Sequence, residues 1–85
     1  MIQNVPKGTN GIEEGALFRR GVGGSMTEIA EVAELVNDRM GIPHVRYSAY
    51  LMRGHYKASP PEQRTLALES FNARYKERIP AGENP

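Results

Sequence analysis

The stretch Gly41-Ile42-Pro43-His44-Val45-Arg46-Tyr47-Ser48-Ala49-Tyr50-Leu51-Met52-Arg53-Gly54 decides how the fold of this chain is interpreted. Proline is tolerated in the first turn of a helix, and glycine is the usual residue where a helix ends. A helix drawn through the stretch places apolar and small side chains on one side, at Val45, Ser48, Ala49 and Met52. The pattern therefore predicts a helix over Pro43–Arg53.

The same stretch lies in a window without acidic residues. Between Asp38 and Glu62 the chain carries no carboxylate, while the formal net charge of all 85 residues is only +1. The position of charge steers binding more than its sum does. We therefore expect a local positive face, of the kind that a cationic helix after a tight turn presents to a DNA groove. Its cations are Arg39, His44, Arg46, Arg53, His55 and Lys57.

The segment before this stretch has the features of another helix. Ser25-Met26-Thr27-Glu28 has the spacing of a capping box, in which the serine hydroxyl and the glutamate satisfy early backbone N–H groups. Apolar side chains then recur at helical spacing until Gly41, at Ile29, Val32, Ala33, Val36 and Met40. The opposite face is acidic, so this predicted helix is a poor surface for DNA.

A third helix is predicted after the acid-free window. Ser59-Pro60-Pro61-Glu62 is a second capping box with proline at the first helical position. The predicted helix runs to about Arg78, and Pro80 follows it. Its apolar stripe consists of Ala67, Leu68, Phe71, Tyr75 and Ile79. Residues 81–85 are predicted to be a loose tail.

The first 24 residues have a different composition. They hold six of the nine glycines, and each glycine disfavours a stable helix through its backbone entropy. We expect a flexible glycine-rich arm over residues 1–24. Within it, Ile12–Arg20 is able to form one turn of helix or a strand that docks on the body.

The residues from Gly41 to Gly54, followed by Ser59-Pro60-Pro61 and the Leu66–Phe71 segment, resemble the lambda-repressor-like helix-turn-helix families of the Cro/C1 and Lac-repressor-headpiece types. In those families a recognition helix ends in a phrase similar to Tyr-Leu-x-x-Gly, and a Ser-Pro-capped helix follows. The chain departs from the pattern at Asn37, where a small residue is usual, and at Pro43, where a serine or threonine cap is common. The resemblance implies an all-α fold: a small domain of three to four helices with a helix-turn-helix core over residues 25–80.

The resemblance also implies a function, which is sequence-specific binding of double-stranded DNA by a transcriptional regulator, a repressor, acting as a homodimer. Arg46 would donate to a guanine edge, and His44 would contact a base or a phosphate. Phosphate contacts are expected from Arg53, His55, Lys57 and Arg64, with hydroxyl contacts from Tyr47 and Tyr50. Arg19 and Arg20 on the arm would reach a minor groove. The Phe71, Tyr75 and Ile79 end of the third helix is the expected dimer face.

Catalysis is not predicted. The two histidines are eleven residues apart, without metal-ligand spacing or a third ligand beside them, and no P-loop lysine follows the glycines at Gly21, Gly23 and Gly24. We therefore expect no enzyme, no cofactor and no metal site. The chain lacks cysteine, as is common in a reducing compartment, and it has no apolar run of the roughly 20 residues that span a bilayer. A soluble cytoplasmic protein without membrane contact is expected.

One alternative function stays open. A small helical adaptor or assembly protein would bind another protein and no nucleic acid. Its methionines Met26, Met40 and Met52 would then belong to adaptable contact surfaces, and its basic face would meet an acidic partner.

Overall fold

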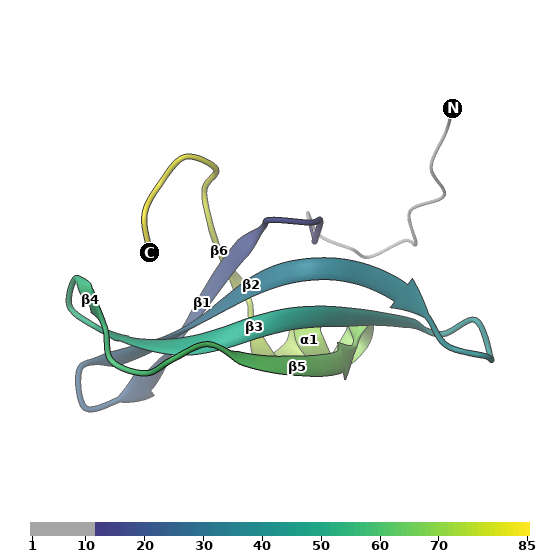
Figure 1. Ribbon diagram of the computed structural model, residues 1–85, viewed down its shortest axis with the longest axis horizontal. Coiled ribbons are helices and arrows are strands. Elements are labelled where there is room, and N and C mark those ends of the chain that lie inside the picture. Colours follow the sequence, from purple (N-terminus) through teal and green to yellow (C-terminus); the bar gives the residue numbers. More distant parts are fainter. Residues whose placement is uncertain (1–11) are drawn as a thin grey trace.

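An antiparallel sheet forms most of the protein in the computed structural model, which describes residues 12–85 (Figure 1). The strands lie in the order β4-β3-β2-β1-β6, and β5 pairs with β3 along the same edge as β4. The elements in chain order are β1 (Leu17–Gly23), β2 (Met26–Asn37), β3 (Pro43–Arg53), β4 (Tyr56–Lys57), β5 (Glu62–Ala67), α1 (Leu68–Arg74) and β6 (Glu77–Ile79).

The central feature of the sheet is the long ribbon of β2 and β3. Eleven residue pairs join the two strands, from Met26 opposite Arg53 to Asn37 opposite Pro43. Both strands are rich in the β-branched and aromatic residues that suit a pleated surface. The turn between them is fixed by Asp38, whose carboxylate accepts backbone N–H bonds from Met40 at 2.8 Å and Ile42 at 2.9 Å. The turn therefore sets the register of the ribbon.

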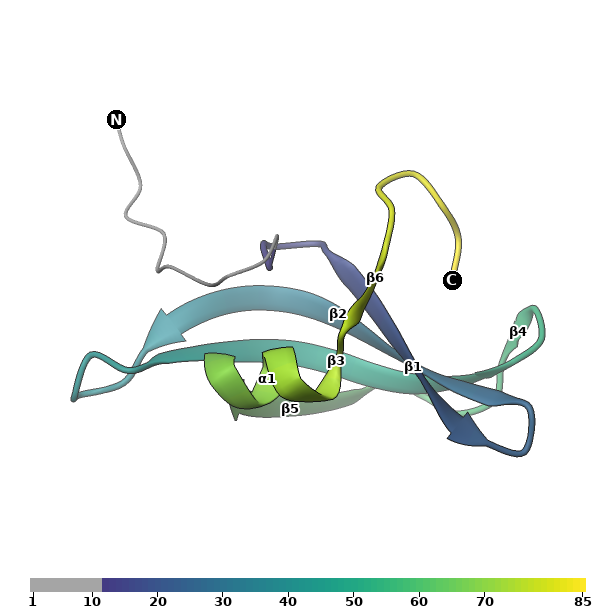
Figure 2. The same ribbon diagram turned by 180° about the vertical axis from the view of Figure 1, so that it is seen from behind.

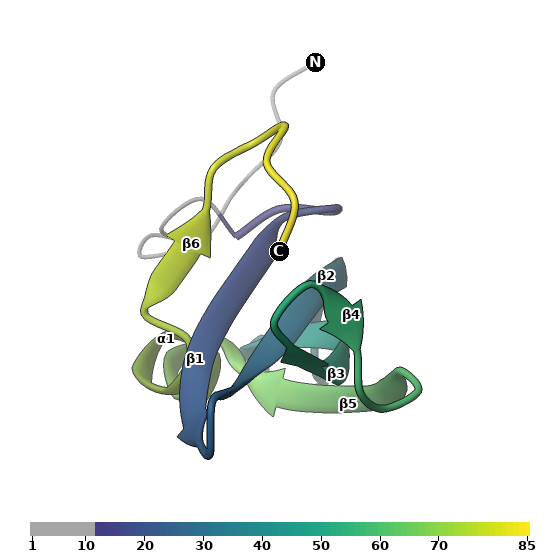
Figure 3. The ribbon, with the colours of Figure 1, turned by 90° about the vertical axis from the view of Figure 1, so that its left-hand side faces the viewer.

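The sheet is strongly bent, and α1 lies on its concave side. Seen along the long axis, β1 and β6 stand at a steep angle to β3 and β5 (Figure 3). The helix lies beside β5 and is followed by β6, which pairs with β1 (Figure 2). Its buried side chains, Leu68 and Phe71, point into the core. One short helix thus fills the hollow of the bent sheet.

Four aromatic rings form the centre of the core. Phe71 is fully buried, and its ring packs edge-on against Phe18 at 5.3 Å and Tyr47 at 5.1 Å between centroids. Tyr75 stacks at a tilt on Phe71 at 4.8 Å and meets Tyr47 edge-on at 5.5 Å. These rings join β1, β3 and the α1 region, so elements far apart in sequence share one cluster.

A second, smaller apolar cluster covers the other face of the sheet. Ile29, Met52 and Ile79 are buried there, with Leu17 and Tyr50 packed against them. Because both faces of β2 are covered at this level, three consecutive residues, Glu28, Ile29 and Ala30, are all buried. This double burial hides the alternation that usually reveals a strand.

The prediction of an all-α domain with a helix-turn-helix core is wrong. Residues 26–37, predicted as the first helix, form β2. Ser25 is no helix cap: its φ of +64°, after Gly24 at +61°, places it in a tight hairpin turn between β1 and β2. The capping-box spacing does not distinguish a helix start from a hairpin turn, because serine is common both at helix N-caps and in tight turns.

The predicted recognition helix is also a strand. Residues 43–53 form β3, in which Val45, Tyr47 and Ala49 are buried and the residues between them are not. These residues fit both a strand with a period of two and a helix with apolar residues three or four positions apart. In the folded protein, packing against the neighbouring strands favours the strand. Nothing in residues 12–85 forms a helix-turn-helix.

The third predicted helix is confirmed only in part. The helix is limited to seven residues, Leu68–Arg74, while Glu62–Ala67 is strand β5. Ser59 caps no helix; its hydroxyl accepts the backbone N–H of Leu51 at 2.9 Å and ties the loop to β3. The expected dimer face is buried within the subunit, since Phe71, Tyr75 and Ile79 are at most 2% exposed.

A flexible glycine-rich arm does not describe residues 12–24, and of the two forms expected within Ile12–Arg20 the structure contains a docked strand. Ile12 and Ala16 are buried in the core, and Leu17–Gly23 is strand β1, paired on both sides with β2 and β6. Residues 1–11 of the predicted arm lie outside the described residues. Across residues 12–85, no helix has the length and apolar character needed to cross a membrane.

The aromatic core yields the first prediction. Phe71→Ala removes the ring that contacts Phe18, Tyr47 and Tyr75, and the loss should lower the free energy of unfolding by about 3–5 kcal/mol. Urea denaturation followed by circular dichroism measures it. Phe71→Leu, which keeps most of the volume, should cost less than half as much. Tyr56→Ser, at an exposed site, serves as the control with a change below about 0.5 kcal/mol. Equal losses for Phe71→Ala and Tyr56→Ser would contradict this account of the core.

Candidate functional site

The structure distributes the predicted DNA-binding residues along the full length of β3. His44 lies next to the β2–β3 turn and Arg53 at the other end of the strand, nine residues away. At the usual rise of a strand this is a separation of about 30 Å. His44, Arg46 and Arg53 are therefore not gathered into one surface patch.

The acid-free window of the sequence is not acid-free in space, because β2 runs beside β3. Glu34 lies opposite Arg46 in the register, and its carboxylate accepts from the Arg46 guanidinium at 3.0 Å. The ring Nδ1 of His44 lies 3.0 Å from the backbone oxygen of Ile42. Arg19, on β1, is paired in the same way with Glu77 on β6 at 2.8 Å. Of the cations in the predicted positive face, Arg46 is thus neutralised by a neighbouring strand.

Arg20 and Arg64, predicted as DNA contacts, hold a buried glutamate instead. Glu28 is 5% exposed and lies on the core side of β2. Its carboxylate accepts from Arg20 at 2.6 Å, from Arg64 at 2.9 Å and from the Tyr75 hydroxyl at 3.1 Å. Arg64 also donates to Glu62 at 2.7 Å. Both arginines are therefore engaged within the protein.

The pKa values of this ionic cluster are shifted in a consistent direction. Burial by itself raises the pKa of Glu28, but the hydrogen bonds and the charge of Arg20, with bonds from Tyr75 and Arg64, outweigh it and hold the pKa below its ordinary value. The hydrogen bond to Glu28 likewise raises the pKa of Arg20. Burial, followed by the bond to Tyr47, raises the pKa of Tyr75. The cluster keeps its charges and stabilises the fold.

The two tyrosines predicted to contact DNA differ in their exposure. Tyr47 is 1% exposed, and its hydroxyl lies 3.4 Å from that of Tyr75 in the core. Tyr50 is half-buried on the opposite face, where the Lys57 ammonium lies 4.5 Å from its ring centroid. Burial, and then the charge of Glu31, raises the pKa of Tyr50. The Tyr47 hydroxyl is therefore not available as an exposed contact, and one site on the Tyr50 ring is occupied by Lys57.

The remaining predicted residues gather at one end of the molecule, which we call the hairpin end: the β1–β2 turn, Gly21–Met26, together with Arg53–Lys57. The register places Gly23 beside Met26, Met26 beside Arg53 and Arg53 beside Tyr56, so four strands meet there (Figure 3). Arg53, His55 and Lys57 are exposed, and none of them has a carboxylate partner among residues 12–85. Arg53 donates to the thioether of Met26, a weak acceptor, at 3.6 Å.

The hairpin end combines two acid-free segments of the sequence. The chain has no acidic residue from Gly15 to Thr27 and none from Arg39 to Pro61. The first of these segments was missed as a signal, because only the pairing of β1 with β2 and of β2 with β3 brings it beside the second. Tight turns at Gly24-Ser25 and Gly54-His55 hold the end in place, with positive φ at Gly54 as a type II′ turn requires.

The opposite end of the β2–β3 ribbon is a small apolar tip formed by Met40 and Ile42. Met40 is 82% exposed and Ile42 48%, although both follow the Asp38 carboxylate that fixes the turn. Exposed apolar side chains on a well-ordered turn are suited to contact with another molecule. Sequence reasoning assigned Met40 to a helix core and to an adaptor surface, and the structure exposes it.

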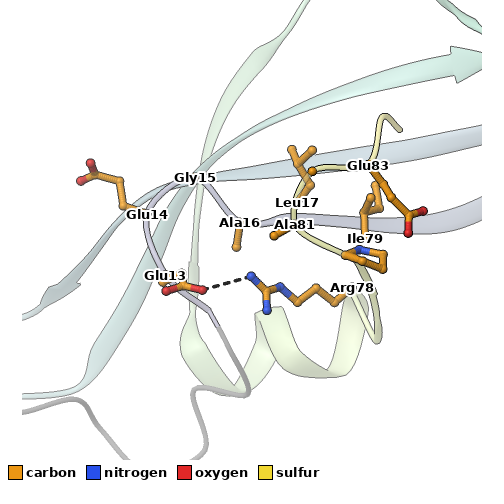
Figure 4. Close-up of a pocket in the computed structure, with 11 residues that line it drawn as sticks. Glu13, Glu14, Gly15, Ala16, Leu17, Arg78, Ile79, Ala81 and Glu83 are labelled. Atoms are coloured by element: carbon orange, nitrogen blue, oxygen red, sulfur yellow. Dashed lines mark hydrogen bonds and ion pairs between the residues drawn. The ribbon is translucent and has the colours of Figure 1, made fainter.

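Two hollows lie elsewhere on the protein. One of about 280 Å³ lies between the Glu13–Leu17 segment and the Arg78–Glu83 segment, where Arg78 donates to Glu13 at 3.0 Å (Figure 4). The other, of about 350 Å³, adjoins the Glu28 cluster next to Leu51 and Pro60. Within residues 12–85 no group of three or more histidine, aspartate or glutamate side chains is arranged to hold a metal ion. Neither hollow presents a paired nucleophile and base.

The fold and these surfaces define a small antiparallel β-domain with an ionic core cluster, a basic hairpin end and an apolar tip. Comparison with known proteins adds no relative: no family model, no curated protein and no solved structure matches the chain.

The ionic cluster gives the second prediction. Glu28→Gln removes the charge that pairs with Arg20 and Arg64, and it should lower the free energy of unfolding at pH 7 by about 2–3 kcal/mol. Since the pKa of Glu28 is held below its ordinary value of 4.5, this stability is present above that pH and is lost as the pH falls through the lowered pKa. Wild type and variant should therefore converge in stability as the pH falls from 7 to about 3.

Urea denaturation at several pH values measures the convergence. Glu34→Gln is the matched control, because its ion pair with Arg46 is about half exposed and should contribute less than about 1 kcal/mol. A constant difference between wild type and Glu28→Gln over the whole pH range would rule out the charged form of Glu28 as the source of stability.

Proposed function

We propose that this chain is a non-catalytic binding domain that contacts the phosphate backbone of nucleic acid through its hairpin end. The observation that carries the proposal is the meeting of two acid-free segments at one end, with Arg53, His55 and Lys57 exposed and without a carboxylate partner among the described residues. Cations that are not neutralised within the protein attract phosphates and release their counterions.

Most arginines away from the hairpin end are already paired, whereas Arg39, Arg74 and Lys76, which also have no carboxylate partner among residues 12–85, lie apart from that end. Arg19, Arg20, Arg46, Arg64 and Arg78 each have a carboxylate within 3.0 Å, so a phosphate would have to compete with a partner already in place. At the hairpin end there is no such competitor in the part of the chain that the structure describes. Gly21, Gly23 and Gly24 beside it have open space where a Cβ would be, so a backbone can approach the main chain at these positions.

The proposal is limited to backbone binding. Phosphate contacts position a protein on nucleic acid but carry no sequence information, and the element expected to read bases was the recognition helix. Because residues 43–53 form β3, sequence-specific repression by a helix-turn-helix is not carried forward. Duplex DNA, the partner expected from the sequence, remains one form of the proposed ligand, and the cytoplasm remains the proposed compartment of this cysteine-free chain.

The third prediction tests the proposal. Arg53→Ala/Lys57→Ala should weaken binding to a random-sequence duplex by about tenfold and reduce the salt dependence of log K by between one and two units, since two phosphate contacts are lost. Fluorescence anisotropy at several salt concentrations measures both effects. The charge-matched control Arg39→Ala/Arg74→Ala, at exposed sites away from the hairpin end, should bind as wild type does.

Equal losses in the two double variants would show that binding depends on total charge, and no binding by folded wild type at low salt would reject the proposal. Both variants should unfold at the urea concentration of wild type, because none of the four cations has an ion pair among residues 12–85.

The apolar tip favours a second candidate function, which is binding of another protein. Met40 and Ile42 are exposed on a turn whose two backbone bonds to Asp38 pre-organise it. Pre-organised apolar side chains lose little entropy on entering a pocket. The adaptor predicted from sequence would thus be a β-domain, since the helical form of that prediction is wrong.

The fourth prediction concerns this tip. A photo-crosslinking amino acid at position 40 should yield one discrete protein adduct in cells, and the adduct should be lost when Ile42→Ser and Asp38→Ala remove the second apolar contact and the turn. The same amino acid at position 22, whose valine is 40% exposed at the opposite end, is the control. A diffuse set of adducts at position 40, equal to that at position 22, would exclude a specific tip partner.

A further inference from the structure

Tyr56 is an exposed aromatic side chain on the edge strand of the hairpin end. It is 65% exposed on β4, directly opposite Arg53 on β3, so the ring and the guanidinium face the same side of the sheet. Directly opposite side chains have Cβ atoms about 5 Å apart. A flat ring and an unpaired cation are therefore adjacent.

The neighbouring pair on the same hairpin has already formed an internal contact. Lys57 and Tyr50 lie on the other face of the sheet, where the ammonium sits 4.5 Å from the ring centroid. Tyr50 is half-buried against Met52 and Ile29. Of the two tyrosines, Tyr56 is the one whose ring remains accessible.

We propose that Tyr56 stacks on an unpaired base of single-stranded nucleic acid while Arg53, on the same face of the sheet, binds an adjoining phosphate. The inference rests on the proposed function and adds a ligand class to it. Bases in a duplex are stacked on one another and do not offer a face, whereas every unpaired base does. Stacking needs no particular base, which fits a site that has an aromatic ring and cations and no recognition helix.

The shape of the hairpin end fits a strand laid across it. Four neighbouring strands end there, and three spacings of about 4.8 Å give a ridge roughly 15 Å wide. Glycines occupy the far side of this ridge at Gly21, Gly23 and Gly24, with open space where a Cβ would be. A sugar-phosphate backbone can therefore approach the protein main chain at one side while a base reaches Tyr56 at the other.

The experiment compares three ligands of equal length on the full chain: a single-stranded oligonucleotide, the same strand with abasic sites throughout, and a duplex. Wild type should bind the single strand more tightly than the abasic strand by about tenfold, the scale of one stacked base. Tyr56→Ala should abolish that difference while leaving binding to the abasic strand within twofold. Tyr56→Phe, which keeps the ring, should behave as wild type.

A direct signal of stacking is available because the chain contains no tryptophan. In Tyr56→Trp the new indole is the only one, and its fluorescence should be quenched by the single strand and not by the abasic strand. Val22→Trp, on the neighbouring turn, is the control for quenching by proximity alone.

The outcomes separate this inference from the proposed function. Equal binding of the single strand and the abasic strand by wild type, with the Arg53 and Lys57 dependence intact, would overturn stacking and leave backbone binding. If poly-glutamate of matched charge bound as tightly as the single strand, the hairpin end would be assigned to acidic proteins. That result would also overturn base stacking by Tyr56. If folded wild type bound none of the three oligonucleotides, both base stacking by Tyr56 and phosphate-backbone binding by the hairpin end would be rejected.

Discussion

The pairing of β2 with β3 is the constraint on which the rest of the structure depends. Every other strand is added to an edge of this ribbon: β1 and then β6 on the β2 side, β4 and β5 on the β3 side. Its register also decides the charge distribution, because Glu34 comes to lie beside Arg46. A shift by one residue would move every side chain to the other face and break the Arg46 pair. The same pairing therefore determines both the core and which cations stay without a carboxylate.

The ionic cluster and the aromatic cluster stabilise each other. Tyr75 belongs to both, since its ring packs on Phe71 and Tyr47 while its hydroxyl donates to Glu28. A buried carboxylate is costly unless its oxygens are bonded, and here two guanidinium groups and one hydroxyl satisfy them. The guanidinium groups come from β1 and β5, the strands on either side of the β2–β3 ribbon. One buried charge thus holds four elements in position around the end of the core.

Part of this architecture could be predicted from the sequence. Helix ends were expected at Gly41 and Gly54, and both glycines do have the positive φ of such a stop, but they lie in turns that join strands. The helix around Phe71 was expected and exists in shortened form. Strand β2 was missed because Ile29 and Ala30 are buried on opposite faces and so give no alternation. In β3, Val45, Tyr47 and Ala49 did alternate, and the competing helical spacing of Val45, Ala49 and Met52 obscured it.

The candidate site shows why charge patterns along a chain mislead for a sheet. In a helix, residues close in sequence share a surface, so an acid-free window becomes an acid-free face. In an antiparallel sheet, the neighbours of a residue come from other strands, and Glu34 and Glu28 reach Arg46 and Arg64 from β2. At the end of a strand, where the chain turns back on itself, a cation has fewer neighbouring strands from which a carboxylate can reach it. Arg53 and Lys57 lie at such an end, and so the basic character of the sequence survives there and is lost along the middle of β3.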